Sequence, residues 1–126
     1  MATARSRLGS AGEKLALAFL ARTGCEILHT NFRCRCGEID IVAREGDCTV
    51  FVEVRTRRGC PEISPAESVG PRKQQRLMRA AAEYLSCHDL WDKPCRFDIV
   101  EVVLQPDAPA DIRVWKGVLE ESQVNP

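Results

Sequence analysis

Two carboxylates, Asp40 and Glu53, lie thirteen residues apart in strand-like segments at 37–43 and 48–55, which a turn-like segment at 44–47 connects. If these segments form a hairpin closed at Gly46 and Asp47, cross-strand partners have position numbers that sum to 93. Asp40 then lies opposite Glu53, and both side chains point to one face. Because like charges directly opposite each other destabilise a sheet, the pair favours a site that binds a divalent metal.

The register of this hairpin has an alternative. A three-residue loop at 45–47 would shift the pairing by one residue and place the two carboxylates on opposite faces. Gly46 in the first central position suits a type II′ two-residue turn, which favours the aligned register. In either case the two acids could instead be ordinary solvated charges. The aligned register also places Glu38 opposite Arg55. In either register, the alternating Ile39, Ile41, Val52 and Val54 predict an apolar core face.

Length and composition favour one compact soluble domain. The chain has 126 residues, of which 44% are hydrophobic and 29% are charged. We expect a single domain over 1–126, with its core at about 9–119. No apolar run approaches the roughly 20 residues of a membrane span, and the first residues lack the apolar stretch of a signal peptide. These features predict a cytoplasmic protein.

The chain contains seven cysteines. An odd number without an export signal argues against a disulfide scaffold, so most are expected to be free thiols. Cys34 and Cys36, with Cys87, His88 and Cys95, could supply a zinc site. However, the spacing lacks the paired Cys-x-x-Cys of common zinc ribbons. A zinc site is therefore the weaker interpretation of these residues.

Basic residues concentrate in the middle of a chain whose net charge is zero. Residues 54–79 contain seven basic and two acidic side chains, a net charge of +5, whereas residues 101–126 have two basic and five acidic ones, a net charge of −3. A basic stretch beside an acidic site is what an enzyme of phosphodiester chemistry needs, because attraction to phosphate gives affinity independent of sequence. A solvated loop and helix surface would have the same composition.

The first element expected to position these residues is a helix over 10–23. Ser10 and Glu13 have the spacing of a capping box, and Gly24 suits a helix end. The apolar stripe of this helix includes Ala16, Leu17 and Leu20. Glu13 lies on the same stripe, and its simplest role is that of the capping acid.

Strands and one further helix are predicted for the rest of the chain. Strands are expected over 25–31, 37–43, 48–55, 96–104 and, more weakly, 113–119, with a long loop at 56–70 and a Pro-containing connection at 105–111. Pro71 starts the second helix in the position that proline prefers. The apolar face of this helix contains Leu77, Ala80, Ala81, Tyr84 and Leu85.

This order of elements, with Asp in the second strand and Glu-x-Arg in the third, resembles the PD-(D/E)XK nuclease superfamily. Segments 31–40, 51–57, 72–74 and 95–100 resemble more closely the YraN-like bacterial family, which is endonuclease-related and similar to archaeal Holliday-junction resolvases. The resemblance covers about 9–119. It implies an α/β protein with a restriction-endonuclease-like αβββαβ core, in which helices flank a mixed central sheet.

The resemblance also implies roles for individual residues. Asp40 and Glu53 would be catalytic metal-binding carboxylates, Glu13 a third acidic ligand and the carbonyl of Val54 a further one. Hard oxygen ligands favour Mg²⁺ or Mn²⁺ over zinc. Arg55 departs from the superfamily, which usually has lysine there, and a guanidinium cannot serve as a general base. Arg55 could still orient the attacking water or stabilise charge on phosphorus.

The expected function is therefore that of a metal-dependent DNA endonuclease, with branched DNA in repair or recombination as the substrate that the resemblance suggests. Candidates for contact with the DNA backbone, which confers little sequence specificity, are Arg33, Arg35, Arg57, Arg58, Lys73 and Arg76. Related resolvases act as dimers, so a homodimer is a further expectation. A catalytically silent nucleic-acid-binding protein of the same fold is the alternative that Arg55 motivates.

Overall fold

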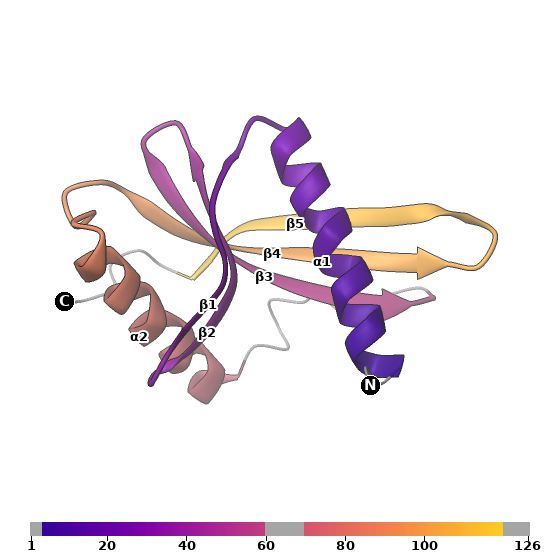
Figure 1. Cartoon of the computed structure of the whole chain (residues 1–126), viewed down its shortest axis with the longest axis horizontal. Coiled ribbons are helices and arrows are strands. Elements are labelled where there is room, and N and C mark those ends of the chain that lie inside the picture. The colour runs from indigo at the N-terminus through magenta and orange to yellow at the C-terminus, as the bar shows by residue number, and fades with distance from the viewer. Residues whose placement is uncertain (1–3, 60–69, 120–126) are drawn as a thin grey trace.

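The computed structural model describes residues 4–59 and 70–119, which form two helices and one five-stranded sheet (Figure 1). The elements are α1 (Ala4–Arg22), β1 (Glu26–Cys34), β2 (Gly37–Glu45), β3 (Cys48–Arg58), α2 (Pro71–Cys87), β4 (Cys95–Gln105) and β5 (Ala108–Leu119). The strands lie in sequence order; β3 and β4 are parallel and all other neighbours are antiparallel. The predicted mixed α/β class is confirmed. Neither described helix is long and apolar enough to span a membrane.

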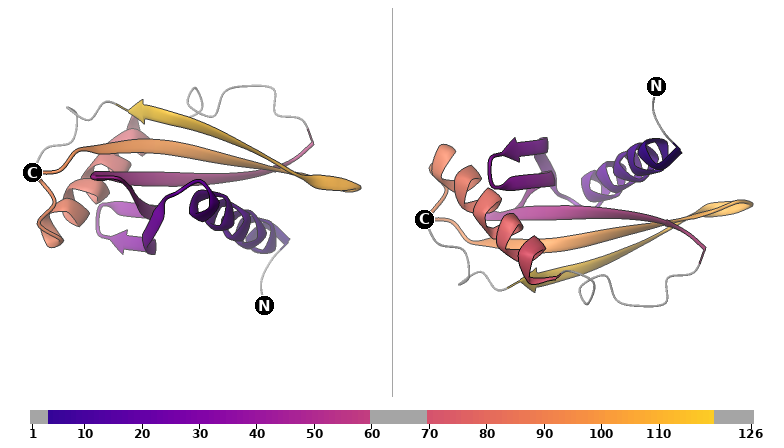
Figure 2. Two further views of the ribbon diagram at one scale, coloured as in Figure 1. Left: turned by 90° about the horizontal axis from the view of Figure 1, so that it is seen from above. Right: turned by 90° about the horizontal axis from the view of Figure 1, so that it is seen from below.

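The two helices cover opposite faces of the sheet. Along β3, Val50 and Val52 pack in one apolar cluster with Ala16 and Leu20 of α1, while Phe51 packs in a second cluster with α2. Side chains of a strand alternate between its faces, so these two clusters are the two sides of one core. Figures 1 and 2 show α2 together with the β1–β2 hairpin at one end of the molecule.

The predicted register of the β2–β3 hairpin is confirmed from the turn as far as the pair of Ile41 and Val52. Gly46 has a φ of 60°, as the first central position of a type II′ turn requires. Beyond Ile41 the pairing with β3 ends and β2 continues only beside β1, where Glu38 pairs with Arg33. Neither the expected pairing of Asp40 with Glu53 nor that of Glu38 with Arg55 is therefore present in the sheet.

Strand β2 bends at Asp40, where it leaves β3. Ile39 packs in the cluster on the α2 side, whereas Ile41 packs in the cluster on the α1 side. In a regular strand, residues two positions apart share a face, so the expectation that Ile39 and Ile41 share a face is wrong. The bend leaves Asp40 at the point where the two strands separate.

Several predicted boundaries differ from those observed. Helix α1 already begins at Ala4, so Ser10 and Glu13 lie within it and do not form a capping box. Its predicted end is confirmed: Gly24 has a φ of 97°, and the Cys25 amide donates to the Leu20 carbonyl at 3.0 Å, as in a Schellman motif.

Strands β1 and β3 extend further than expected, to Cys34 and Arg58, and β5 begins at Ala108, within the predicted connection. Of the predicted loop at 56–70, residues 60–69 lie outside the described part.

Gly12 sets how closely α1 approaches β3, and we expect Gly12→Ala to destabilise the protein. A Cβ atom at this buried position would lie 1.8 Å from Oγ1 of Thr56, so the helix or the strand would have to move. Overpacking of this kind costs about 1–3 kcal/mol of unfolding free energy. Urea denaturation would measure it. The matched control is Gly9→Ala in the exposed part of the same helix, where no atom lies within 4 Å and a small stabilisation is expected. Equal effects of the two substitutions would contradict the close packing.

Candidate functional site

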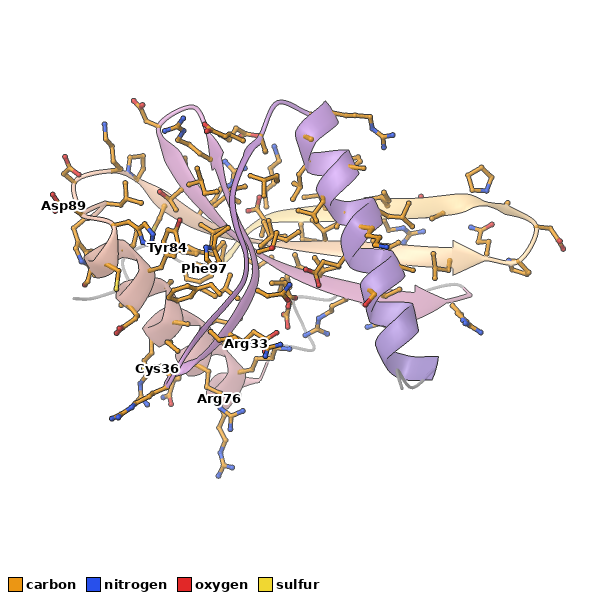
Figure 3. All side chains as sticks on the ribbon, viewed as in Figure 1. Arg33, Cys36, Arg76, Tyr84, Asp89 and Phe97 are labelled. Atoms are coloured by element: carbon orange, nitrogen blue, oxygen red, sulfur yellow. The ribbon has the colours of Figure 1, made fainter. Side chains whose placement is uncertain are left out.

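A hollow of about 540 Å³ lies where the β1–β2 hairpin, β3 and the first turns of α2 meet. Its lining contains both predicted carboxylates, Asp40 and Glu53, together with Glu38. The basic side chains in the lining are Arg33, Lys73 and Arg76. Figure 3 shows Arg33 and Arg76 at the end of the molecule where the hairpin meets α2. The structure therefore brings the two acids of the sequence analysis together with three of the six candidate basic residues.

Glu53 is an enclosed carboxylate that lies between two cations. Its side chain is 10% exposed. Oε1 forms an ion pair with the ammonium group of Lys73, and Nη2 of Arg55 lies 3.6 Å from Oε2. Oε2 is buried and accepts no hydrogen bond. An enclosed carboxylate oxygen without a hydrogen bond can accept a further cation.

Asp40 is fixed to the backbone of the neighbouring strand. Its Oδ2 accepts a hydrogen bond of 2.8 Å from the Val54 amide, on the edge of β3 that β2 no longer pairs with. Burial raises the pKa of Asp40 from 3.8 to about 6; this hydrogen bond opposes the shift, and the charges of Glu53, Glu13 and Glu38 add to it. The site therefore concentrates negative charge around a carboxylate that burial already makes costly to ionise.

Glu13 lies near this charge, but a hydrogen bond holds it to a different partner. Its Oε1 accepts a 3.0 Å hydrogen bond from Nδ2 of Asn31, which sits in β1 with a φ of 53°. Within residues 4–59 and 70–119 no group of three or more His, Cys, Asp or Glu side chains lies close enough to hold a metal ion. Asp40 and Glu53 remain as a two-carboxylate set, which is a common protein contribution to a Mg²⁺ site.

Lys73 points to the sheet, although the sequence analysis considered it only as a backbone contact. On a helix, residues spaced by four, three and four positions share a face, and Lys73 shares such a stripe with Leu77, Ala80 and Tyr84. Leu77 also lines the hollow, and the other two are buried. The position of Lys73 on the apolar stripe of the helix can be recognised in the sequence. It indicates that the side chain of Lys73 points toward the sheet.

The other candidate basic residues lie elsewhere. Nε of Arg57 lies 3.3 Å from Oε2 of Glu101, a fully buried residue of β4 that the sequence analysis did not single out. The sequence does contain an indication of this buried charge, because Glu101 is a charged residue within the apolar part of segment 96–104. Arg58 lines a separate hollow near the end of β4. Arg35 is exposed in the turn between β1 and β2, outside the lining of the main hollow.

The described cysteines give no support for a zinc module. None of the six that the structure describes is assigned to a disulfide, and no metal-binding group of Cys and His side chains occurs among the described residues. Cys25 and Cys95 are buried and Cys48 is partly buried. These residues contribute to packing in the manner of small apolar side chains.

The raised pKa of Asp40 predicts how stability depends on pH when no divalent metal is present. Between the ordinary value of 3.8 and the folded value of about 6, the folded protein binds this proton more tightly than the unfolded chain. The contribution of Asp40 to the unfolding free energy should therefore increase as the pH falls from 7 to 4, by up to about 3 kcal/mol.

Urea denaturation of the wild type and of Asp40→Asn between pH 4 and 8 would measure this contribution. We expect the amide variant to be the more stable protein at pH 7.5 and to lose its advantage near pH 4. The exposed turn variant Asp47→Asn serves as the control and should follow the wild type. A constant difference between wild type and Asp40→Asn across this range would contradict the raised pKa.

The fold and the site define a small mixed α/β protein in which carboxylates of two adjacent strands meet a lysine of the crossover helix. A model of the family described as "Uncharacterised protein family UPF0102" matches residues 12–102, which include all residues that line the hollow. The chain belongs to this family, and its predicted membership of the YraN-like group is thereby confirmed.

Relatives described as UPF0102 proteins match most of the chain. The protein of Moorella thermoacetica is 48% identical over 118 residues, which cover 93% of this chain and 98% of the relative. The protein of Dehalococcoides mccartyi is 47% identical over 121 residues, covering 96% and 99%. That of Symbiobacterium thermophilum is 48% identical over 101 residues, covering 80% and 86%. The similarity therefore extends over nearly the whole length of these relatives.

Proposed function

We propose that this protein is a metal-dependent endonuclease that hydrolyses phosphodiester bonds of DNA. The observation that carries the proposal is that Asp40 and Glu53 line one hollow beside Lys73, with further arginines at its rim. The observed order of elements contains the αβββαβ series of the restriction-endonuclease-like core, followed by β5. The resemblance to PD-(D/E)XK nucleases in these strands supports the same reaction.

The chemistry of the donor set fits Mg²⁺ or Mn²⁺. Asp40 and Glu53 would hold the ion through carboxylate oxygens, and Oε2 of Glu53 is enclosed without a hydrogen bond. When bound, such an ion stabilises developing negative charge on phosphate oxygens and makes the attacking water more acidic. It would also favour the ionised form of Asp40, whose pKa is raised by burial and further by the neighbouring carboxylates.

In the proposed reaction a water oxygen forms a bond to phosphorus as the bond from phosphorus to the leaving sugar oxygen breaks. One proton of the water passes to solvent, and the leaving oxygen takes up a proton from solvent. Arg33 and Arg76 line the hollow and are exposed, and they would contact neighbouring phosphates. Contacts with the DNA backbone do not depend on base sequence. The proposed enzyme would therefore select its substrate by the shape of the DNA and not by its sequence.

A catalytically silent nucleic-acid-binding protein is the second candidate. The observation that favours it is the occupation of Glu53 by cations on both sides, Lys73 at Oε1 and Arg55 near Oε2. In such a protein these ion pairs would replace the metal and would neutralise the site permanently. Binding of DNA without cleavage would then be the whole activity.

Cleavage of a panel of branched, nicked, double-stranded and single-stranded DNA with Mg²⁺ or Mn²⁺ tests the proposal, and Arg55 makes the test specific. For an active nuclease we expect Arg55→Lys to preserve or increase the rate, because lysine keeps the positive charge. Arg55→Ala should reduce the rate on the order of a hundredfold, as the loss of one electrostatic stabiliser does. If wild type, Arg55→Lys and Arg55→Ala all bind DNA and none cleaves any substrate, the silent binding protein is the correct function.

A further inference from the structure

We propose that Lys73 is a catalytic residue of this site, whose ammonium group moves from Glu53 to a non-bridging oxygen of the scissile phosphate when a divalent metal binds. This inference rests on the proposed function and distinguishes the roles of the two cations that contact Glu53, Lys73 and Arg55. In the metal-free protein, Lys73 would act as the cation that neutralises Glu53.

The position of Lys73 in the fold supports this role. It lies in the first turns of α2, on the helix face whose later residues are buried against the sheet. The helix therefore aims this side chain at the carboxylates, and the ion pair with Oε1 of Glu53 shows that it reaches them. Arg76, one turn further along, lines the rim of the same hollow.

Lys73 can leave its partner more readily than Arg55 can. The side chain of Lys73 is 49% exposed, whereas that of Arg55 is 18% exposed and projects from the middle of the sheet. A lysine ammonium on a flexible four-carbon chain can be aimed at a new oxygen with little rearrangement. Arg55 is held among its neighbours in β3, which suits a fixed electrostatic role.

Charge supplies the reason for the movement. Asp40 and Glu53 would hold a divalent cation, and the ammonium group that pairs with Glu53 would then experience repulsion, since both carry positive charge. Arg33 and Arg76 also line the hollow, and Glu38 already lies 3.6 Å from Nε of Arg33. The phosphate that enters with the substrate then offers Lys73 a new anionic partner.

The test compares Lys73→Met, which keeps the length of the side chain but not its charge, with Lys73→Arg and with the control Lys93→Met. Lys93 is exposed in the turn before β4, away from the hollow. Circular dichroism and thermal unfolding establish that each variant is folded. Two quantities are then measured for each protein: cleavage of the DNA panel, with kcat and KM, and the affinity for Mn²⁺ alone by calorimetry.

We expect Lys73→Met to lower kcat on the order of a hundredfold with little change in KM. Lys73→Arg should remain within about tenfold of the wild-type rate, because it keeps the charge. Mn²⁺ should bind Lys73→Met more tightly by about twofold to fivefold, because Glu53 loses its competing cation. Lys93→Met should match the wild type in both measurements.

The two proposals fail in different ways. If the wild type cleaves DNA and Lys73→Met has an unchanged kcat, the nuclease function stands and the role of Lys73 is overturned. A change confined to KM would make Lys73 a binding residue only, which also overturns the proposal. If the wild type cleaves nothing, the nuclease function is overturned together with the catalytic role of Lys73. An Mn²⁺ affinity that Lys73→Met leaves unchanged or lowers would overturn the competition for Glu53.

Discussion

Asp40→Asn and Glu53→Gln are each expected to reduce metal-dependent cleavage of DNA by at least about a hundredfold while the protein remains folded. Each substitution keeps the shape of the side chain and removes one of the two carboxylates of the hollow that are proposed to hold the metal. In Asp40→Asn the amide oxygen can still accept the hydrogen bond from Val54, so the bend of β2 should persist. Single-turnover cleavage at saturating Mn²⁺ would measure the loss.

Calorimetry with Mn²⁺ shows whether a variant cleaves more slowly because it binds the metal more weakly or because a step after metal binding is impaired. Both variants should bind Mn²⁺ more weakly than the wild type, because a neutral amide is a poorer ligand than a carboxylate. Asp47→Asn, which removes a carboxylate from the turn at the far end of the same hairpin, should alter neither quantity. Wild-type cleavage by both site variants would show that the hollow is not the site of hydrolysis.

Arg57→Met is expected to lower the free energy of unfolding by about 2–3 kcal/mol, since removal of one partner leaves a buried charge unpaired. Glu101 is fully buried, neither of its carboxylate oxygens accepts a hydrogen bond, and Nε of Arg57 lies 3.3 Å from Oε2. The expected change lies below the roughly 3–5 kcal/mol typical of breaking a buried ion pair, because the Arg57 side chain is 32% exposed and Glu101 pairs in register with Arg55 and Arg113. Urea denaturation at neutral pH would measure the change.

Arg58→Met provides a matched control for this prediction. Arg58 follows Arg57 at the end of β3 and is exposed, so its replacement should change stability by less than about 0.5 kcal/mol. The double variant Arg57→Met with Glu101→Leu should recover most of the loss, because it removes both charges. Equal effects of Arg57→Met and Arg58→Met would mean that the ion pair contributes nothing to stability.

The sequence was sufficient for the parts of the fold that local chemistry determines. Gly46 selected the turn and thereby the register as far as Ile41 and Val52, and Pro71 marked the start of α2. The bend at Asp40 could not be predicted in this way, because it depends on β2 leaving β3 to pack with β1 against α2. Alternation of apolar residues alone assigned Ile39 to the wrong face.

The part of the candidate site that lies within one hairpin could also be predicted from the sequence, because local chemistry determines the turn. Asp40 and Glu53 each lie one residue beyond the last pair of the β2–β3 hairpin, Ile41 and Val52, so the predicted register brings them near each other although they do not pair in the sheet. The contacts of Lys73 with Glu53 and of Arg57 with Glu101 join segments that are distant in sequence, and only the packing of α2 and β4 brings them together. In the sequence, Lys73 and Arg57 belong to the same basic stretch. In the structure they contact different carboxylates, Glu53 and Glu101.

The parallel pairing of β3 with β4 determines the order in which this protein can fold. Two-residue turns connect β1 to β2 and β2 to β3, whereas the pair of Thr49 and Cys95 closes a loop of more than forty residues. Long loops are closed at a higher entropic cost, so the three-stranded meander is expected to form before β4 docks. Asp40 and Glu53 would then come together early, and Lys73 would join them only when the crossover helix packs.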